Sequence, residues 1–210
     1  MFLQIDKTDK YTDNEGMFSN IINKIGSFFL DMVETIVIAL SIFLVVYLFF
    51  LQPHQVSGLS MFPTYHDKEY ILTDKVSYRL GDPQRGDVVV FHAPEAANCP
   101  KGTGCDFIKR VIAIPGDTVE IRDHMFYINA QPLNEDYIPV ENILNAGHYI
   151  EGRAVALGAN EYFVVGDNRP HSSDSRVWGP IGKENIVGKA FFRYWPPGRI
   201  GILKHVTYQL

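Results

Sequence analysis

Serine and lysine stand in two segments of this chain where they could carry out nucleophilic catalysis together. Ser60 begins the segment Ser60-Met-Phe-Pro-Thr64, and Lys109 lies inside the apolar run 107–114. A serine hydroxyl attacks a carbonyl efficiently when a base takes its proton and hydrogen-bond donors hold the developing oxyanion. None of the seven histidines lies in an evident triad context, and the chain has no Gly-x-Ser-x-Gly elbow. A Ser–Lys pair is therefore the catalytic arrangement that the sequence indicates.

Lys109 can act as a base only in its neutral form. A lysine with the free-peptide pKa of about 10.4 is roughly 0.1% neutral near pH 7.4. Strand alternation puts Phe107, Lys109 and Val111 on one face, where desolvation would lower the pKa of the amine. The alternation of side chains along the strand does not show which of its two faces is buried. Taken alone, Lys109 reads equally as an outward-facing strand residue and Ser60 as a turn hydroxyl before Pro63.

A third polar segment, Gly166-Asp-Asn-Arg-Pro-His-Ser-Ser-Asp-Ser-Arg176, is followed by a Trp-Gly pair. In their order, the Ser-Met-x-Pro-Thr, Lys-Arg-Val-x-x-x-Pro-Gly-Asp and Gly-Asp-Asn-Arg…Ser-x-Asp-Ser-Arg motifs resemble those of type I signal peptidases. The resemblance covers most of the chain after residue 52, and its last motif is the most specific. It implies a membrane-bound serine endopeptidase that cuts signal peptides from exported preproteins.

The resemblance implies a role for each matched residue. Ser60 would be the nucleophile and Lys109 the general base, and Ser172 would orient the lysine amine through a hydrogen bond. Asp174 and Arg176 would form a supporting ion pair beside the site. The chemistry implies no cofactor and no metal. Without the motifs, Ser172 reads as an ordinary loop residue.

The chain departs from the family pattern near the nucleophile. Many members carry a hydroxyl two residues before it, but this chain has Gly58 there, as other relatives do. The backbone N–H of Ser60 is then the surest oxyanion donor, with Ser57 as a further candidate. Pro170 and His171 replace the acidic and amide residues common in the third motif, which leaves the shape of that loop open.

Substrate recognition follows from the form of signal peptides, which carry small residues at the first and third positions before the cut. Such substrates call for shallow apolar pockets and an edge strand that pairs with an extended backbone. The resemblance places the pockets near Val56, Met61, Phe107 and Ile108. Each of these side chains could equally belong to the core.

An apolar run precedes these motifs, and residues 36–51 carry no charge. A membrane-spanning helix needs roughly 17 to 25 mainly apolar residues. We therefore expect a tail over 1–27 that is mobile before about Asn20, an anchor helix over 28–51 and a peptidase domain over 52–210. A cleaved signal sequence and a buried core helix are the alternatives, although the run starts late for a signal sequence.

The flanking charges give a weak orientation. Lys7, Lys10 and Lys24 precede the run, and Lys68 is the first basic residue after it. This bias favours a cytoplasmic N-terminus and an extracytoplasmic peptidase domain, attached by a single span to a bacterial plasma membrane. An organelle enzyme of bacterial ancestry is the alternative. The resemblance and the span also predict lipid as a partner.

Two cysteines, Cys99 and Cys105, flank a short loop. On the oxidising side of a membrane they are expected to form a local disulfide. A metal site with His92 would have at most three ligands without an obvious fourth, and two free thiols are the remaining alternative.

The chain after the anchor reads as short strands. β-Branched and aromatic residues dominate 87–91, 107–114, 118–121, 125–128, 161–165 and 190–194, and Gly and Pro separate these runs. The expected fold is mainly β, with antiparallel sheets or a partly closed barrel behind the N-terminal helix. The stretch 132–158 has the least clear pattern, and we interpret it as an insertion that contains a little helix.

The overall charge argues against a generic nucleic-acid binder, because the chain has a net charge of −5 and no cluster of Lys and Arg. Two other functions were weighed. A self-cleaving Ser–Lys repressor would carry a DNA-binding domain where this chain has its apolar run. An inactive membrane-anchored binding module would be expected to have lost Ser60 or Lys109. The sequence does not indicate an oligomeric state.

Overall fold

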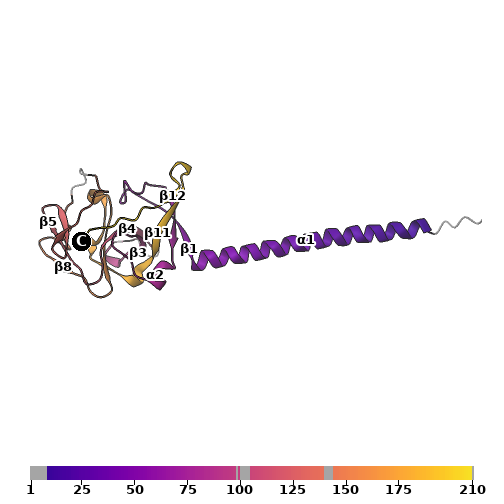
Figure 1. The fold of residues 1–210 in the computed structure, drawn as a ribbon, viewed down its shortest axis with the longest axis horizontal. Helices are drawn as coiled ribbons and strands as arrows, with labels where there is room; N and C mark the ends of the chain where they lie inside the picture. Colours follow the sequence, from indigo (N-terminus) through magenta and orange to yellow (C-terminus); the bar gives the residue numbers. More distant parts are fainter. Residues whose placement is uncertain (1–8, 98, 100–104, 140–143, 210) are drawn as a thin grey trace, which may run out of the picture. The chain divides into compact units, whose positions relative to one another are not determined.

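The computed structural model describes residues 9–97, 99, 105–139 and 144–209, in two compact units that meet in sequence between Leu48 and Phe49. The first unit consists mainly of one long helix, α1 (Asp9–Phe49) (Figure 1). The helix begins at Asp9, so the expectation of a mobile tail before about Asn20 is wrong from residue 9 onward. The reason is that apolar residues at helical spacing, among them Phe18, Ile22 and Ile25, continue the pattern without a proline.

Helix α1 has the length and apolarity of a membrane span over Met17–Phe49, with a hydropathy of 2.5 in its most apolar window. None of that window is buried inside the protein, which argues against a buried core helix. The hydroxyls of Ser27, Thr35 and Ser41 donate to carbonyls within their own helix, at 2.7–3.0 Å. Polar groups in the apolar segment are thus satisfied internally, as a hydrocarbon environment requires.

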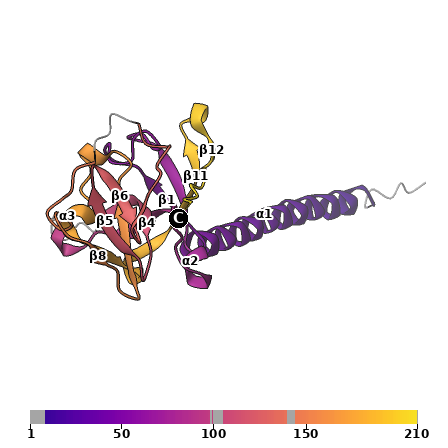
Figure 2. The same ribbon diagram turned by 60° about the vertical axis from the view of Figure 1, so that its left-hand side comes forward.

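The second unit contains two antiparallel sheets, which confirms the predicted β class (Figures 1 and 2). The larger sheet follows the order β1 (Leu51–Gln55), β2 (Tyr70–Asp74), β11 (Ile186–Trp195), β3 (Val88–His92), β4 (Asp106–Ala113), β9 (Glu161–Val165), β10 (Ile181–Gly182), and β12 (Gly201–Ile202) pairs with β11. The smaller sheet has the order β7 (Gln131–Pro132), β6 (Met125–Ile128), β5 (Thr118–Arg122), β8 (Val155–Ala156). Among the described strands, β1 and β10 do not pair, so the larger sheet curls without closing.

Helices are short in this unit. The α-helices are α2 (Ser77–Leu80) and α3 (Ser175–Trp178), and the 3₁₀ turns are η1 (Glu95–Ala97), η2 (Arg169–His171), η3 (Lys183–Asn185) and η4 (Pro197–Arg199). The stretch 132–158, expected to hold a little helix, contains strand ends and turns in its described part, 132–139 and 144–158. Its buried residues, such as Leu133, Leu144 and Ile150, instead pack against the smaller sheet.

The central strands position the catalytic segments. Strand β3 lies inside the larger sheet and is covered on both faces, so Val88 through Phe91 are all buried. One face packs against Val56, Met61 and Tyr65 of the segment that carries Ser60. The core therefore fixes the backbone on either side of the serine, because buried side chains in a close-packed interior have little freedom to shift.

Cys99 and Cys105 form a disulfide with a Cα–Cα distance of 6.1 Å, which confirms that prediction. The residues 100–104 between them lie outside the described part of the chain. With both sulfurs in the bond, the alternative metal site with His92 has no thiolate ligand.

Candidate active site

Ser60 lies in a tight turn segment that leaves β1. The start of this segment is fastened by the backbone of the following turn, because Val56 N–H donates to Glu69 O at 2.8 Å and Lys68 N–H donates to Val56 O at 2.9 Å. Gly58 adopts φ +88°, a conformation that disfavours side chains with a Cβ, and its N–H donates to Asp67 Oδ1 at 2.8 Å. Glycine adopts this conformation of the turn before Ser60 without strain.

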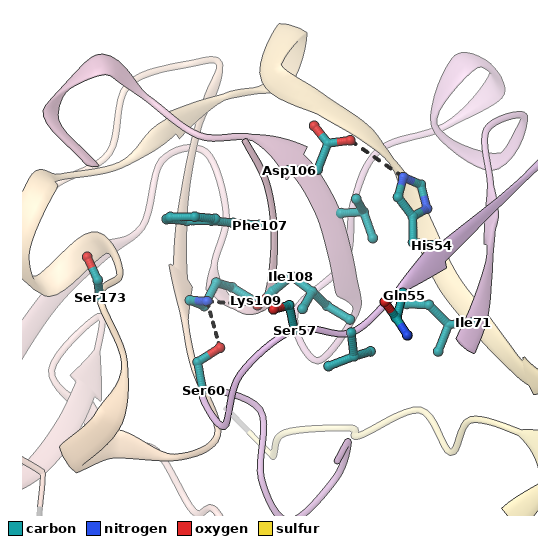
Figure 3. A pocket seen from close by; sticks show the side chains of 12 residues that line it. His54, Gln55, Ser57, Ser60, Ile71, Asp106, Phe107, Ile108, Lys109 and Ser173 are labelled. Carbon is teal, nitrogen blue, oxygen red and sulfur yellow. Dashed lines mark hydrogen bonds and ion pairs between the residues drawn. The ribbon is translucent and has the colours of Figure 1, made fainter. Parts of the chain in front are cut away.

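Lys109 reaches Ser60 from strand β4. Its amine Nζ lies 3.0 Å from Ser60 Oγ and 3.0 Å from the carbonyl oxygen of Ile108 (Figure 3). The ring of Phe107 lies beside it, with 5.1 Å between Nζ and the ring centroid. Lys109 is 4% exposed and its neighbour Arg110 1%, so both faces of β4 are covered from Lys109 onward. The structure therefore brings the two predicted residues into hydrogen-bond distance.

Burial changes the protonation of Lys109. Desolvation lowers its pKa to about 8, although the negative charges of Asp174 and Asp167 oppose the shift. With that pKa about a fifth of the amine is neutral near pH 7.4, compared with roughly 0.1% for a free lysine. The site thus supplies a usable base at neutral pH without a histidine.

A buried ion pair connects β4 to the loop after β9. Arg110 donates to both carboxylate oxygens of Asp167, at 2.9 Å and 2.7 Å, and to Gly86 O at 2.9 Å. Asp167 in turn accepts a hydrogen bond from Thr64 Oγ1 at 2.5 Å. Because Thr64 closes the segment that begins with Ser60, this network ties the nucleophile segment, β4 and the third motif together.

Asp174 and Arg176 form the ion pair that the resemblance implies. The Arg176 guanidinium donates to the two carboxylate oxygens at 2.8 Å and 2.7 Å, and both residues are buried. Asp174 also accepts from Gly166 N–H at 3.1 Å, and Arg176 donates to Arg169 O at 2.8 Å. The pair therefore holds both ends of the loop 166–176 in place.

Ser172 lies beside the site without the expected hydrogen bond. Its Oγ is buried and has no hydrogen-bond partner in the structure, so the predicted bond to the Lys109 amine is not formed here. The hydroxyl packs against Gly166, where a Cβ would overlap both Ser172 Oγ and Ser60 O. Gly166 is thus the residue that allows the third motif to approach the nucleophile.

A cleft of about 250 Å³ opens beside the Ser60–Lys109 pair. Val56, Phe107 and Ile108 line it, as the resemblance implies for substrate pockets. Met61 does not; it is 1% exposed and packs in the core under the turn. The pattern of apolar residues near Ser60 could not separate the side chain that faces the core from those that face the cleft.

Several lining residues were not found by sequence reasoning, namely His54, Gln55, Ile71, Val90, Asp106 and Ser173. His54 and Asp106 come from β1 and β4, on the two walls of the cleft, and His54 Nε2 lies 3.6 Å from Asp106 Oδ2 (Figure 3). Burial lowers the pKa of His54. Only the curl of the sheet brings these residues together, so no local sequence signal could have identified them.

The two walls of the cleft expose strand edges. β1 is the first strand of the sheet order and pairs only with β2 among the described strands. The first half of β4 pairs with β3, but its pairing with β9 begins at Arg110. The backbone of 106–109 therefore has one edge without a neighbouring strand in the described structure. An extended peptide could pair with such edges.

Asn168 makes two contacts with the nucleophile segment. Its backbone N–H donates to Ser60 O at 3.0 Å, and its side-chain Nδ2 donates to Leu59 O at 3.0 Å. Asn168 belongs to the Gly-Asp-Asn-Arg motif, but the sequence alone predicted no role for it. The motif was the available signal, but the contact partner is more than a hundred residues away in the chain.

Comparisons with known proteins point to one family. A family model described as signal peptidase, peptidase S26, matches residues 29–195. The probable signal peptidase I-1 of Synechocystis sp. is 38% identical over 185 residues, covering 86% of this chain and 90% of that protein. Signal peptidase IB of Staphylococcus aureus (strain COL) is 35% identical, covering 80% and 90%. A crystal structure of a signal peptidase I from Enterococcus faecalis V583 matches 52% of this chain and 97% of that chain, with 32% identity and a TM-score of 0.39.

Proposed function

This chain belongs to the signal peptidase family, peptidase S26, and we propose that it uses Ser60 as the nucleophile and Lys109 as the general base. It is a serine endopeptidase that removes signal peptides. One observation carries the assignment of the two residues: a lysine amine, buried and with a lowered pKa, lies 3.0 Å from a serine hydroxyl at the edge of a cleft.

In the proposed mechanism, neutral Lys109 takes the proton of Ser60 as Oγ attacks the carbonyl carbon of the scissile bond. The Ser60 N–H donates to the oxyanion that forms. The lysine ammonium then gives its proton to the leaving amine, which departs as the new N-terminus. In the second half, Lys109 takes a proton from a water molecule while the water oxygen attacks the carbonyl carbon of the acyl-enzyme. The bond from that carbon to Ser60 Oγ then breaks, and the lysine ammonium returns the proton to Oγ.

The residues of the third motif would support this chemistry. Asp174 and Arg176 hold the loop that packs behind Ser60, and they are proposed as positioning residues. Ser172 is proposed to contact the Lys109 ammonium once Ser60 has given up its proton, because its buried hydroxyl has no other partner in the structure. Once protonated, Lys109 has three N–H donors, and the structure places Ser60 Oγ and Ile108 O within reach of two of them, which leaves the third for Ser172.

The cleft suits an extended peptide with small side chains. A signal peptide would pair with the free edges beside β1 and β4, which would place its scissile carbonyl at Ser60. Val56, Phe107 and Ile108 would then contact the small residues at the first and third positions before the cut, in an Ala-x-Ala pattern. Preproteins that carry such signal peptides are the proposed substrates.

We also propose a single span with a cytoplasmic N-terminus and an extracytoplasmic catalytic unit in the plasma membrane. The charges around α1 support that orientation weakly, and its apolar length supports the span. The arm formed by β11 and β12 exposes Trp195, Ile200 and Ile202, and it extends from the sheets in Figure 2. Aromatic and aliphatic residues of this kind would place the arm at the lipid surface, where signal peptides are embedded.

The test is cleavage of a peptide that spans an Ala-x-Ala junction, by purified protein in detergent with lipid. Wild type is compared with Ser60→Ala and Lys109→Ala, and folding is checked by circular dichroism. We expect both variants to lose at least about 10³-fold in kcat. We also expect kcat/KM of the wild type to rise with pH through the pKa of Lys109, about 8, because only the neutral amine is a base. Wild-type speed in either variant would refute the assignment.

A further inference from the structure

The developing oxyanion needs a donor that is already aimed at it before the reaction begins. In this chain Gly58 removes the side-chain hydroxyl that many relatives carry, so the Ser60 N–H has to supply most of this stabilisation. The structure records no acceptor for the Ser60 N–H among its described residues. The direction of this N–H must therefore be fixed by the contacts of the peptide unit to which it belongs.

The peptide unit that carries the Ser60 N–H also carries the carbonyl of Leu59. This unit is planar, and in the trans form its C=O and N–H point in opposite directions. Leu59 O accepts from Asn168 Nδ2 at 3.0 Å and from the N–H of Phe62 at 3.1 Å, so the side-chain amide is one of the two donors that hold this end of the unit. A hydrogen bond that fixes the direction of the Leu59 carbonyl therefore also fixes the Ser60 N–H, which points the opposite way.

We propose that Asn168 is a positioning residue that aims the Ser60 N–H at the oxyanion by fixing the Leu59–Ser60 peptide plane. The proposal rests on Ser60 being the nucleophile. Asn168 does not touch the substrate, and it acts only through the orientation of this one peptide unit.

A second bond makes the arrangement more rigid. The backbone N–H of Asn168 donates to Ser60 O at 3.0 Å, which fixes the peptide unit on the other side of the serine as well. One residue thus holds the planes before and after the nucleophile. Rotation of either plane would break a hydrogen bond made by Asn168, a residue that is itself 7% exposed.

Asn168 can hold these planes because its own loop is anchored. Its neighbour Asp167 is bound to buried Arg110, and Arg169 on the other side makes an ion pair with Glu135 at 2.5 Å. The amide is oriented by its acceptor, because only the NH₂ end can donate to a carbonyl. The loop therefore provides a fixed point from which the side chain can act.

The test distinguishes a role of Asn168 in orienting the Ser60 N–H from a general role in stabilising the fold. Asn168→Ala removes the side-chain donor and leaves the backbone bond to Ser60 O. We expect kcat to fall about 10- to 100-fold, less than the 10²- to 10³-fold loss of a whole oxyanion donor. KM is expected to change less than twofold, and the pH at which kcat/KM rises should not move, because Lys109 is untouched.

Two binding measurements sharpen the test. A peptide boronate ending in Ala forms a tetrahedral adduct with Ser60, and its affinity should fall by the same factor as kcat/KM. The substrate peptide, bound to Ser60→Ala with and without Asn168→Ala, should bind equally well. Equal losses for the boronate and the substrate peptide would mean that the variant disturbs the whole cleft, and this would overturn the proposal.

A matched control removes another side-chain amide. Asn129 donates to Asp117 Oδ1 at 2.8 Å in the turn after β6 and adopts φ +52°, so Asn129→Gly deletes its amide without straining the backbone. Its kcat should equal that of wild type.

If Asn168→Ala folds poorly, Asn168→Ser takes its place, because the serine hydroxyl is one bond too short to reach Leu59 O. Constants are normalised to the folded fraction from near-ultraviolet dichroism.

The outcomes also separate this proposal from the proposed function. Unchanged kcat in the normalised Asn168 variants, with Ser60→Ala inactive, would overturn the role of Asn168 alone. Full activity in Ser60→Ala would overturn the assignment of the nucleophile and, with it, this inference.

Discussion

At the scale of single residues, the burial of Lys109, the proposed general base, would favour activity at the cost of stability. Burial against Phe107 and the strand lowers the pKa of Lys109, so that a neutral base is present near pH 7. The same burial disfavours the folded state whenever the amine is charged, because its desolvation is not fully offset by Asp174 and Asp167. Replacing the lysine should therefore abolish activity and raise stability.

We predict that Lys109→Met is more stable than wild type at pH 7, by up to about 3 kcal/mol. The pKa of Lys109 is lowered from 10.5 to about 8 in the folded state, so the unfolded chain binds more protons between these two pH values. Stability of wild type then rises with pH from about 8 to about 10.5, and the advantage of the variant should shrink over that range.

Urea denaturation between pH 6.5 and 10.5 measures this difference. Lys204→Met, at an exposed position, serves as the control: it keeps Lys109, so its stability should rise with pH as that of wild type does. Equal stability of Lys109→Met and wild type at every pH would show that the lysine is not strained by burial.

At the scale of elements, the site is made by three segments that approach closely. The turn after β1 brings Ser60, β4 brings Lys109, and the loop after β9 packs behind both through Asp167 and Asn168. The closest approach lies at Gly166, which has no room for a Cβ between Ser172 and the backbone of Ser60. Glycine here serves close packing, since no unusual φ is recorded for it.

We predict that Gly166→Ala lowers kcat by at least about 100-fold, because the loop must move away from Ser60 and Asn168 then loses its contacts. The variant should also be destabilised by about 1–3 kcal/mol through overpacking. Peptide cleavage and thermal unfolding measure the two effects. Gly198→Ala is the matched control, because a Cβ there would meet nothing within 4 Å. Wild-type kcat in Gly166→Ala would show that the loop tolerates displacement.

At the scale of the whole molecule, one apolar helix and one exposed apolar arm suit an enzyme that works at a membrane. Helix α1 carries the apolar length, and strand β12 of the arm adds Ile202, which is 80% exposed. Isolated exposed apolar residues are common, but here Trp195, Ile200 and Ile202 lie on the same arm. Lipid contact would bury them.

We predict that the double variant Trp195→Ser/Ile202→Ser cleaves a membrane-embedded preprotein about tenfold more slowly in lipid vesicles, since less apolar surface enters the interface. Cleavage of a short soluble peptide in detergent should stay within twofold of wild type. Leu80→Ser is the control, because Leu80 is equally exposed but lies on α2, away from the arm in sequence. An equal loss of activity in both assays would show that the arm supports the catalytic unit itself and does not act through contact with lipid.

The sequence by itself determined the family and the class of fold, and it indicated which residues would carry the proposed chemistry. Ser60, Lys109 and the third motif were recognisable because residue type and order carry them, and the apolar run, the β class and the disulfide follow from local composition. Each of these features depends on neighbours in the chain.

The tertiary structure decided everything that depends on contacts between distant segments. Met61 enters the core while Val56 lines the cleft, Ser172 lies apart from the lysine amine, and Asn168 holds the serine's peptide planes. The start of α1 also differed, because a helical pattern continues through residues that are individually polar. Which atoms meet across the cleft is set by the curl of the sheet and by close packing, and neither can be read from a local pattern.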